Sequence, residues 1–213
     1  MPGECYKDEM VATKDKFAGT RSTLLVRLKD LEDQEAWYDF FETYWKLIFN
    51  FAIKADLDES DAEDVVQETV RAVARRMPEF EYNRQRGSFR SWLLTLTHRR
   101  VIDHFRHAER HGGRETIGVE PGELAGHSST VPSDLEQLWN DEWQQWLVDM
   151  ALEQVKQKVN ARQYQIFYAY VIREWEVAAV IETFDTNRDQ VYQAKSRVGK
   201  LFDAAVKELE EQS

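Results

Sequence analysis

The feature that most constrains the fold is the spacing of apolar residues between residues 62 and 77. They recur at the i, i+3, i+4, i+7 interval of a helix: Ala62, Val65, Val66, Thr69, Val70, Val73 and Met77. Ser60 or Asp61 could cap its start, and Pro78 would end it, because proline lacks the amide that continues the helix. The pattern predicts an amphipathic helix with one buried face.

The same interval returns along most of the chain. It appears in residues 37–51, 89–105, 135–150 and 164–171, and no stretch shows the alternation of a half-buried strand. We therefore expect an all-α fold.

Glycine, proline and serine cluster between residues 106 and 133, where few large apolar residues occur. Such composition is typical of a flexible tether. We predict two helical domains: a mobile lead-in at 1–20, a first domain at 21–107, a flexible linker at 108–133 and a second domain at 134–213. The spacing of three tryptophans indicates a stripe that packs one helix on another: Trp139, Trp143 and Trp146. The alternative is that they dock on the first domain or on a regulator.

Charge is distributed unevenly along the chain. The formal net charge is -11, yet residues 71–114 hold eleven arginines and no lysine against four acids. Residues 29–68 hold three lysines against thirteen acids. Because binding depends on where charge lies, the basic segment is expected to bind phosphates and the acidic segment a different partner.

The C-terminal segment has the spacing of a helix-turn-helix. A short helix over residues 177–184 precedes a tight turn and a longer helix whose buried stripe is expected to be Val191, Ala194, Val198 and Leu201. Asp185 stands where glycine is usual and can enter the left-handed region at modest cost, and Asn187 is a good cap. Several donors that lie away from this stripe could face a DNA major groove: Arg188, Gln190, Gln193, Lys195, Arg197 and Lys200.

Several motifs in this order resemble those of bacterial RNA polymerase sigma factors of the extracytoplasmic-function (ECF) group. Residues 61–69 (DAEDVVQET), 87–94 (GSFRSWLL) and 103–106 (DHFR) resemble conserved region two, and residues 191–198 (VYQAKSRV) resemble the recognition helix of region four. Two departures are Ala179-Val180-Ile181, where the family usually has Glu-Val-Ala, and Asp185 in the turn.

The resemblance implies a sigma factor that binds core polymerase, directs it to promoters and assists promoter melting. It implies two contacts with polymerase, at the clamp helices of the largest subunit and at the flap, and it implies promoter DNA as a partner, with an anti-sigma protein as a further one. The face that would grip the clamp helices consists of Asp61, Asp64, Gln67 and Glu68. An ordinary solvated helix face is the alternative.

The minus-ten element would be bound by the basic segment and the aromatic residues beside it. The candidates are Phe80, Tyr82, Arg84, Arg86, Arg90, Arg99, Arg100 and Arg106. Phe80 and Tyr82 could stack an extruded base, whereas Phe89 and Trp92 are expected in the core. Asp103 could orient an arginine in place of touching DNA.

The sequence offers no legible enzyme site. It has no nucleophile with a base and no phosphate-cradling loop, and the histidines at 98, 104, 107 and 111 lack a matching cysteine or carboxylate cluster, so we expect no cofactor and no metal. No stretch has the length of a membrane span, which favours the cytoplasm and no membrane partner. The alternative function is a helix-turn-helix regulator that acts without polymerase.

Overall fold

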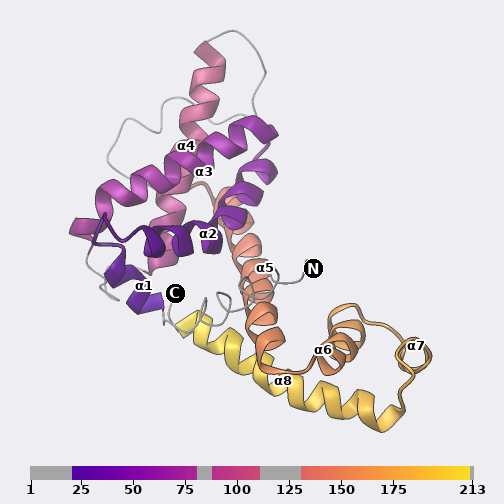
Figure 1. The fold of residues 1–213 in the computed structure, drawn as a ribbon. Coiled ribbons are helices and arrows are strands. Elements are labelled where there is room, and N and C mark those ends of the chain that lie inside the picture. The colour runs from indigo at the N-terminus through magenta and orange to yellow at the C-terminus, as the bar shows by residue number, and fades with distance from the viewer. Residues whose placement is uncertain (1–20, 81–87, 111–130, 212–213) are drawn as a thin grey trace, which may run out of the picture. The chain divides into compact units, whose positions relative to one another are not determined.

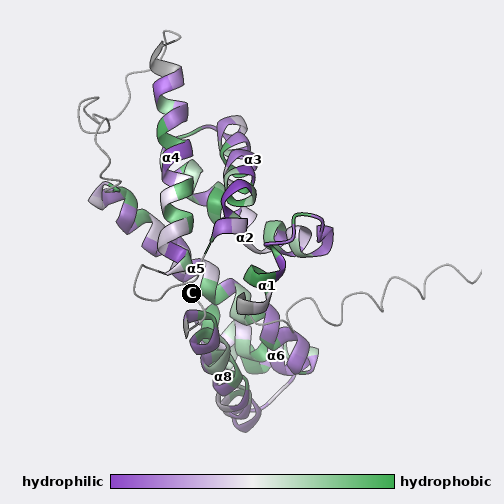
Figure 2. Ribbon diagram, turned by 90° about the vertical axis from the view of Figure 1, so that its left-hand side faces the viewer, coloured by the Kyte–Doolittle hydropathy of each residue, from purple (hydrophilic) through white to green (hydrophobic). Residues whose placement is uncertain are grey.

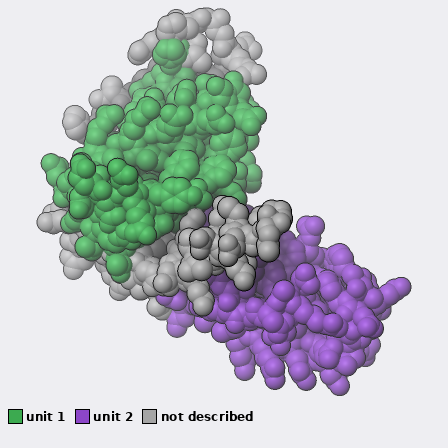
Figure 3. Space-filling view, viewed as in Figure 1, with its two compact units in different colours: residues 1–143, 213 green, residues 144–212 purple. Residues whose placement is uncertain are grey.

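The computed structural model describes residues 21–80, 88–110 and 131–211, which form helices joined by short turns. No strand occurs among these residues, so the all-α prediction is confirmed. The chain divides into two compact units, residues 1–143 with residue 213 (unit 1) and residues 144–212 (unit 2), coloured separately in Figure 3.

The elements of unit 1 are α1 (Arg21–Arg27), α2 (Gln34–Lys54), α3 (Glu59–Arg76), the 3-10 turn η1 (Met77–Glu79), α4 (Phe89–Arg110) and the first part of α5 (Ser133–Lys158). α3 packs against both α2 and α4 (Figure 1). In Figure 2, α3 and α4 each carry a hydrophilic and a hydrophobic face. The core they share contains fully buried residues such as Phe40, Phe51, Val65, Phe89 and Leu93.

The start of α3 differs from the sequence prediction. Asp58 is the cap, because its side chain accepts a hydrogen bond from the amide of Asp61 at 2.9 Å. The predicted caps, Ser60 and Asp61, lie inside the helix. Three capping residues occur within four positions here, and the apolar pattern begins too late to choose between them. Pro78 lies in η1, directly after the end of α3, as predicted.

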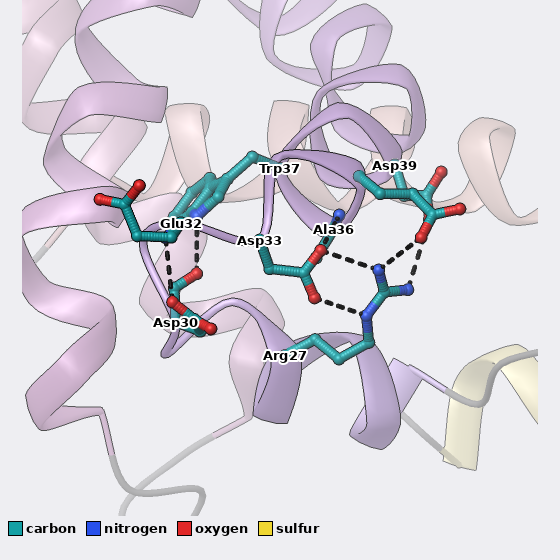
Figure 4. A network of polar contacts seen from close by, with 8 residues as sticks. Arg27, Asp30, Glu32, Asp33, Ala36, Trp37 and Asp39 are labelled. Atoms are coloured by element: carbon teal, nitrogen blue, oxygen red, sulfur yellow. Dashed lines mark hydrogen bonds and ion pairs between the residues drawn. The ribbon is translucent and has the colours of Figure 1, made fainter.

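The turn between α1 and α2 is held by charged side chains (Figure 4). Arg27 donates two hydrogen bonds to Asp33, at 2.8 and 2.9 Å, and one to Glu35 at 3.0 Å. Asp39 lies 3.9 Å from the same guanidinium. Asp33 also caps α2 by accepting from the amide of Ala36 at 2.9 Å. The hydrogen bond from Arg27, together with that from Ala36, lowers the pKa of Asp33.

The first part of α5 belongs to unit 1. Trp139 is fully buried, and its ring meets Phe51 of α2 edge to face at 5.2 Å between centroids. Glu142, only 3% exposed, accepts a hydrogen bond from Lys54 of α2. Trp139 therefore packs on a helix of the first predicted domain, which is the alternative that the sequence left open for the stripe.

Unit 2 is built from the rest of α5 with α6 (Ala161–Phe167), the π-helical turn η2 (Tyr168–Ile172), α7 (Val177–Thr183) and α8 (Arg188–Glu211). Ile166, Val180 and Val191 share one buried cluster, which joins α6, α7 and α8. Val155, Phe167 and Val198 share a second, which joins α5, α6 and α8. The predicted lead-in at 1–20 and residues 111–130 of the predicted linker lie outside the described residues, so both remain predictions.

Candidate protein and nucleic-acid interfaces

The polar side of α3 carries the four residues predicted to contact polymerase. Asp64 and Gln67 are exposed, and Gln67 accepts a hydrogen bond from Arg71 at 3.3 Å. Asp61 and Glu68 are only partly exposed, because they face α4. The predicted face therefore has two outward side chains and two that flank a neighbouring helix.

His104 of α4 lies between the two inward carboxylates. Its Nδ1 is 3.6 Å from Asp61 Oδ1, and its Nε2 is 3.9 Å from Glu68 Oε2. In the sequence this histidine is one of four that lack a matching cysteine or carboxylate cluster. Its position depends on how α3 packs against α4, which the spacing of residues along either helix does not reveal.

A basic cluster forms where α4 passes the end of α3. Burial, and then the proximity of Arg99 and Arg100, lower the pKa of Arg76, so these three arginines lie close together. Arg99 is exposed, and Arg100 donates to Asp103 at 3.1 Å, which confirms the prediction that Asp103 orients an arginine. Arg76 was not among the predicted contacts and adds a positive charge to this surface.

Arg90, predicted to bind DNA, makes contacts inside unit 1. It donates to the side-chain oxygen of Asn140, and its guanidinium carbon lies 5.5 Å from the ring centroid of Trp143. Partial burial lowers its pKa. An arginine stacked and hydrogen-bonded in this way would have to leave both contacts to meet a phosphate.

Three aromatic rings gather at the end of η1. Phe80 lies 4.5 Å from Trp92 and 6.2 Å from Phe89, measured between ring centroids. Phe89 is fully buried, as predicted for a core residue, while Phe80 and Trp92 are partly exposed. Tyr82, Arg84 and Arg86, also predicted to bind DNA, lie outside the described residues. Arg106 is partly exposed on α4.

The helix-turn-helix of α7 and α8 forms as the sequence predicts. Asp185 has a positive φ of 44°, and Asn187 accepts a hydrogen bond from the amide of Gln190 at 2.9 Å. Thr186 donates a hydrogen bond to the side-chain oxygen of Gln190. Arg162 of α6 was not anticipated: it donates to the carbonyl oxygens of Phe184 and Asp185 at 2.8 and 2.7 Å and so holds the turn.

All six predicted DNA contacts on α8 are exposed: Arg188, Gln190, Gln193, Lys195, Arg197 and Lys200. Lys195 differs from the others, since its ammonium lies 5.5 Å from the ring centroid of Tyr170. The predicted buried stripe is correct for Val191, Ala194 and Val198 but wrong for Leu201, which is 38% exposed. The ring of Phe202 packs against Phe167 instead, at 6.0 Å between centroids.

The described residues contain no cluster of side chains suited to a metal ion. Within the same residues, none of the helices has the length and apolar content needed to cross a bilayer.

Comparison with known proteins agrees with the region two motifs. Residues 40–111 match the sigma-70 region 2 family. The chain is similar to the ECF RNA polymerase sigma factor SigK of Mycobacterium bovis (strain BCG / Pasteur 1173P2), with 30% identity over 83 residues that cover 39% of this chain and 43% of the relative. SigK of Mycobacterium tuberculosis (strain ATCC 25177 / H37Ra) matches to the same extent. The match thus spans less than half the length of these relatives, and the resemblance to ECF sigma factors is confirmed.

Proposed function

We propose that this chain, in which residues 40–111 match sigma-70 region 2, is a sigma factor that binds core RNA polymerase, directs it to promoters and assists their opening. The family match carries the proposal. The exposed donors of α8 at the other end of the chain support it, because a sigma factor reads DNA with a second module.

The polymerase contact is proposed on the polar side of α3. Asp64 is exposed there, and Glu68 is partly exposed one turn later, so both carboxylates could meet basic side chains of the clamp helices. A second contact, with the flap of the polymerase, is proposed for unit 2 on the resemblance alone.

A double charge reversal tests the α3 contact. We expect Asp64→Arg with Glu68→Arg to abolish co-purification with core polymerase while the far-UV circular dichroism stays unchanged. The matched control is Asp134→Arg with Asp141→Arg, which reverses two exposed carboxylates of α5 in unit 1, outside both proposed polymerase contacts. If the folded α3 variant binds polymerase as well as wild type, the contact is misassigned.

Promoter opening is proposed to use Phe80 and the arginines of α4. Stacking of one base on an aromatic ring contributes about 1–3 kcal/mol, which corresponds to roughly 5- to 150-fold in affinity. We expect Phe80→Leu to weaken holoenzyme binding to a single-stranded minus-ten oligonucleotide within this range, and Phe80→Tyr to retain binding because its ring still stacks. Equal affinities of both variants and wild type would exclude Phe80 from the base contact.

The upstream promoter element is proposed to be read by α8. Gln190 lies in the first turn, where side chains commonly reach base edges, and Lys200 lies three turns later, where phosphates are the usual partner. With holoenzyme and a library of upstream elements, we expect Gln190→Ala to relax preference at one or two positions. Lys200→Ala should weaken all sequences alike and lower the salt slope by about one unit. If Gln190→Ala weakened all sequences alike and Lys200→Ala relaxed the sequence preference, this assignment of the two residues would be wrong.

A regulator that acts without polymerase is the less favoured function, because it gives no role to the region 2 match. The two functions differ in a direct measurement. A sigma factor should show promoter-specific transcription only after mixing with core polymerase, whereas a stand-alone regulator should bind its operator unaided. The site of action is proposed to be the cytoplasm, where its proposed partner works, and control by an anti-sigma protein is proposed on the resemblance alone.

A further inference from the structure

The turn between α7 and α8 has the backbone hydrogen bond of a helix end that usually contains glycine. The amide of Thr186 donates to the carbonyl of Ile181 at 3.1 Å, which is the six-to-one bond of a Schellman motif. The left-handed position of this motif usually holds glycine, because glycine has no β-carbon to clash. Here that position is Asp185, with a φ of 44°. The turn therefore keeps a conformation that its own residue disfavours.

The packing of α7 offers little to hold that turn. Of the seven residues of α7, all of them within the described range, Val180 alone is buried. Ile181 and Phe184 are partly buried against the cluster that joins α6, α7 and α8. A short helix with so little buried surface opens locally at a low cost, so its end needs another support.

Arg162 of α6 provides such a support. One terminal nitrogen of its guanidinium donates to the carbonyl oxygen of Phe184 at 2.8 Å and to that of Asp185 at 2.7 Å. Carbonyls at the C-terminal end of a helix lack partners inside it, so both bonds use free acceptors. The two peptide planes that carry these oxygens are joined at the α-carbon of Asp185. Their relative direction is set by φ and ψ of Asp185, so the two bonds together restrain these angles.

The position of Arg162 is itself fixed by its neighbours. Asn160 caps α6 by accepting a hydrogen bond from the amide of Gln163 at 2.9 Å, and α6 packs against α8. The ring of Phe184 is held from a different segment, since it stacks on Trp175 with 6.5 Å between centroids. The end of α7 is thus tied by a side chain to the helix on which α8 packs.

The backbone angles of Asp185 matter for DNA reading because α8 begins three residues later, at Arg188. A rotation at this position changes the angle between α7 and α8. In a helix-turn-helix the second helix lies in the major groove while the first crosses the DNA backbone. The angle between the two helices therefore decides which base edges the first turn of α8 can reach.

We propose that Arg162 is a positioning residue for promoter reading. It clamps the two carbonyls that flank the backbone angles of Asp185, offsets the absence of glycine there and so sets the angle between α7 and α8. The consequence for DNA rests on the proposed sigma-factor function, whereas the clamp can be measured without polymerase or DNA.

Hydrogen exchange of the full chain, followed by NMR, tests the clamp. We expect Arg162→Gln to speed exchange of the Thr186 amide about tenfold, a change of about 1.4 kcal/mol in local opening, and to leave the amide of Ala205 within about twofold. If circular dichroism shows that this variant does not fold, Arg162→Lys has a side chain one bond shorter and should speed the exchange about threefold. Unchanged exchange of Thr186 in a folded variant would overturn the proposal.

A double-mutant cycle with position 185 tests what the clamp offsets. Glycine adopts the left-handed conformation unaided, so in an Asp185→Gly background Arg162→Gln should change the exchange of Thr186 less than about twofold. Asp185→Asn removes the same charge but keeps the β-carbon, so in that background the effect should stay at least about fivefold. If both substitutions at 185 removed the effect equally, Arg162 would act through the charge of Asp185, and the proposal would fail.

Promoter reading tests the consequence. With holoenzyme and a library of upstream elements, we expect Arg162→Gln to lower the preference for the best element over single mismatches at least about threefold, with an unchanged salt slope. Adding Asp185→Gly to the same chain should restore the preference. The matched control is Arg173→Gln, which removes another exposed positive charge of unit 2 and should leave the preference within about twofold.

A different role for Arg162 would give a different pattern. If Arg162→Gln weakened all sequences alike and lowered the salt slope by about one unit, Arg162 would be a phosphate contact and the proposal would be wrong. It would also be wrong if Asp185→Gly failed to restore the preference. A wild-type holoenzyme with no preference among upstream elements would refute the proposed reading of DNA by α8, and with it the role of Arg162 there. The exchange rates would still decide whether the clamp exists.

Discussion

Replacement of Trp139 by alanine should destabilise unit 1 severely. Trp139 lies at the start of α5, more than 80 residues along the chain from Phe51, the α2 residue that its ring contacts. If this part of α5 is integral to the core of unit 1, removal of the indole ring leaves a cavity between α2 and α5.

The size of the effect follows from burial. Trp139 is 0% exposed, and removal of a buried tryptophan side chain costs about 3–5 kcal/mol, of which an edge-to-face ring contact contributes about 0.5–1.5 kcal/mol. The indole nitrogen of Trp139 has no hydrogen-bond partner among the described residues, so Trp139→Phe loses no hydrogen bond. We expect Trp139→Phe to cost about 1–2 kcal/mol, clearly less than alanine.

Urea unfolding followed by far-UV circular dichroism measures both variants, since this signal does not depend on the number of tryptophans. The control is Trp175→Ala in unit 2, where the ring is 42% exposed and stacks on Phe184. It should cost less than about 1.5 kcal/mol. A loss below about 1 kcal/mol for Trp139→Ala, or one no larger than for Trp175→Ala, would refute the assignment of Trp139 to a packed core.

Further predictions concern pH, capping and the predicted linker. Burial lowers the pKa of His98 in the folded chain, so as pH falls this histidine is protonated in the unfolded chain before it is protonated in the folded chain. Stability should therefore fall as pH drops below about 6.5, and His98→Gln should flatten that slope in pH-dependent thermal unfolding. Arg27 lowers the pKa of Asp33, so the contribution of this pair to the stability of the fold should be present above about pH 4 and lost as pH falls through the folded pKa of Asp33. Arg27→Gln should reduce this loss of stability in acid in the same measurement. Asn187→Ala should destabilise unit 2 by about 1 kcal/mol in urea unfolding, and Asn187→Asp should restore it. Limited proteolysis should cut first within residues 108–133, and first cleavage inside α3 or α8, detected by mass spectrometry, would contradict the predicted linker.

Local sequence rules were sufficient where one residue decides the conformation. Asp185 enters the left-handed region and Asn187 caps α8 because both properties belong to the residue and its immediate neighbours. The all-helical fold follows in the same way from the apolar interval. At α3 the same rules predicted Ser60 or Asp61 as the cap, and the structure shows Asp58 instead.

Side-chain contacts between distant elements were beyond the sequence. Charge and the family resemblance both predict that Arg90 binds DNA, but its partner Asn140 is 50 residues away along the chain. His104 reaches the carboxylates of α3 only because α3 and α4 pack side by side. Leu201 was placed in the buried stripe of α8, yet the stripe continues from Val198 to Phe202 because Phe167 lies on that side.

The α1–α2 turn has a consequence for how related sequences can vary. One guanidinium lies within 4 Å of three carboxylates, those of Asp33, Glu35 and Asp39. Lysine offers a single point charge in place of a planar fork, so it could not bind Asp33 in the same bidentate way while still reaching the others. In an alignment of related chains, we therefore expect replacement of the arginine at position 27 to coincide with loss of an acid at 33, 35 or 39.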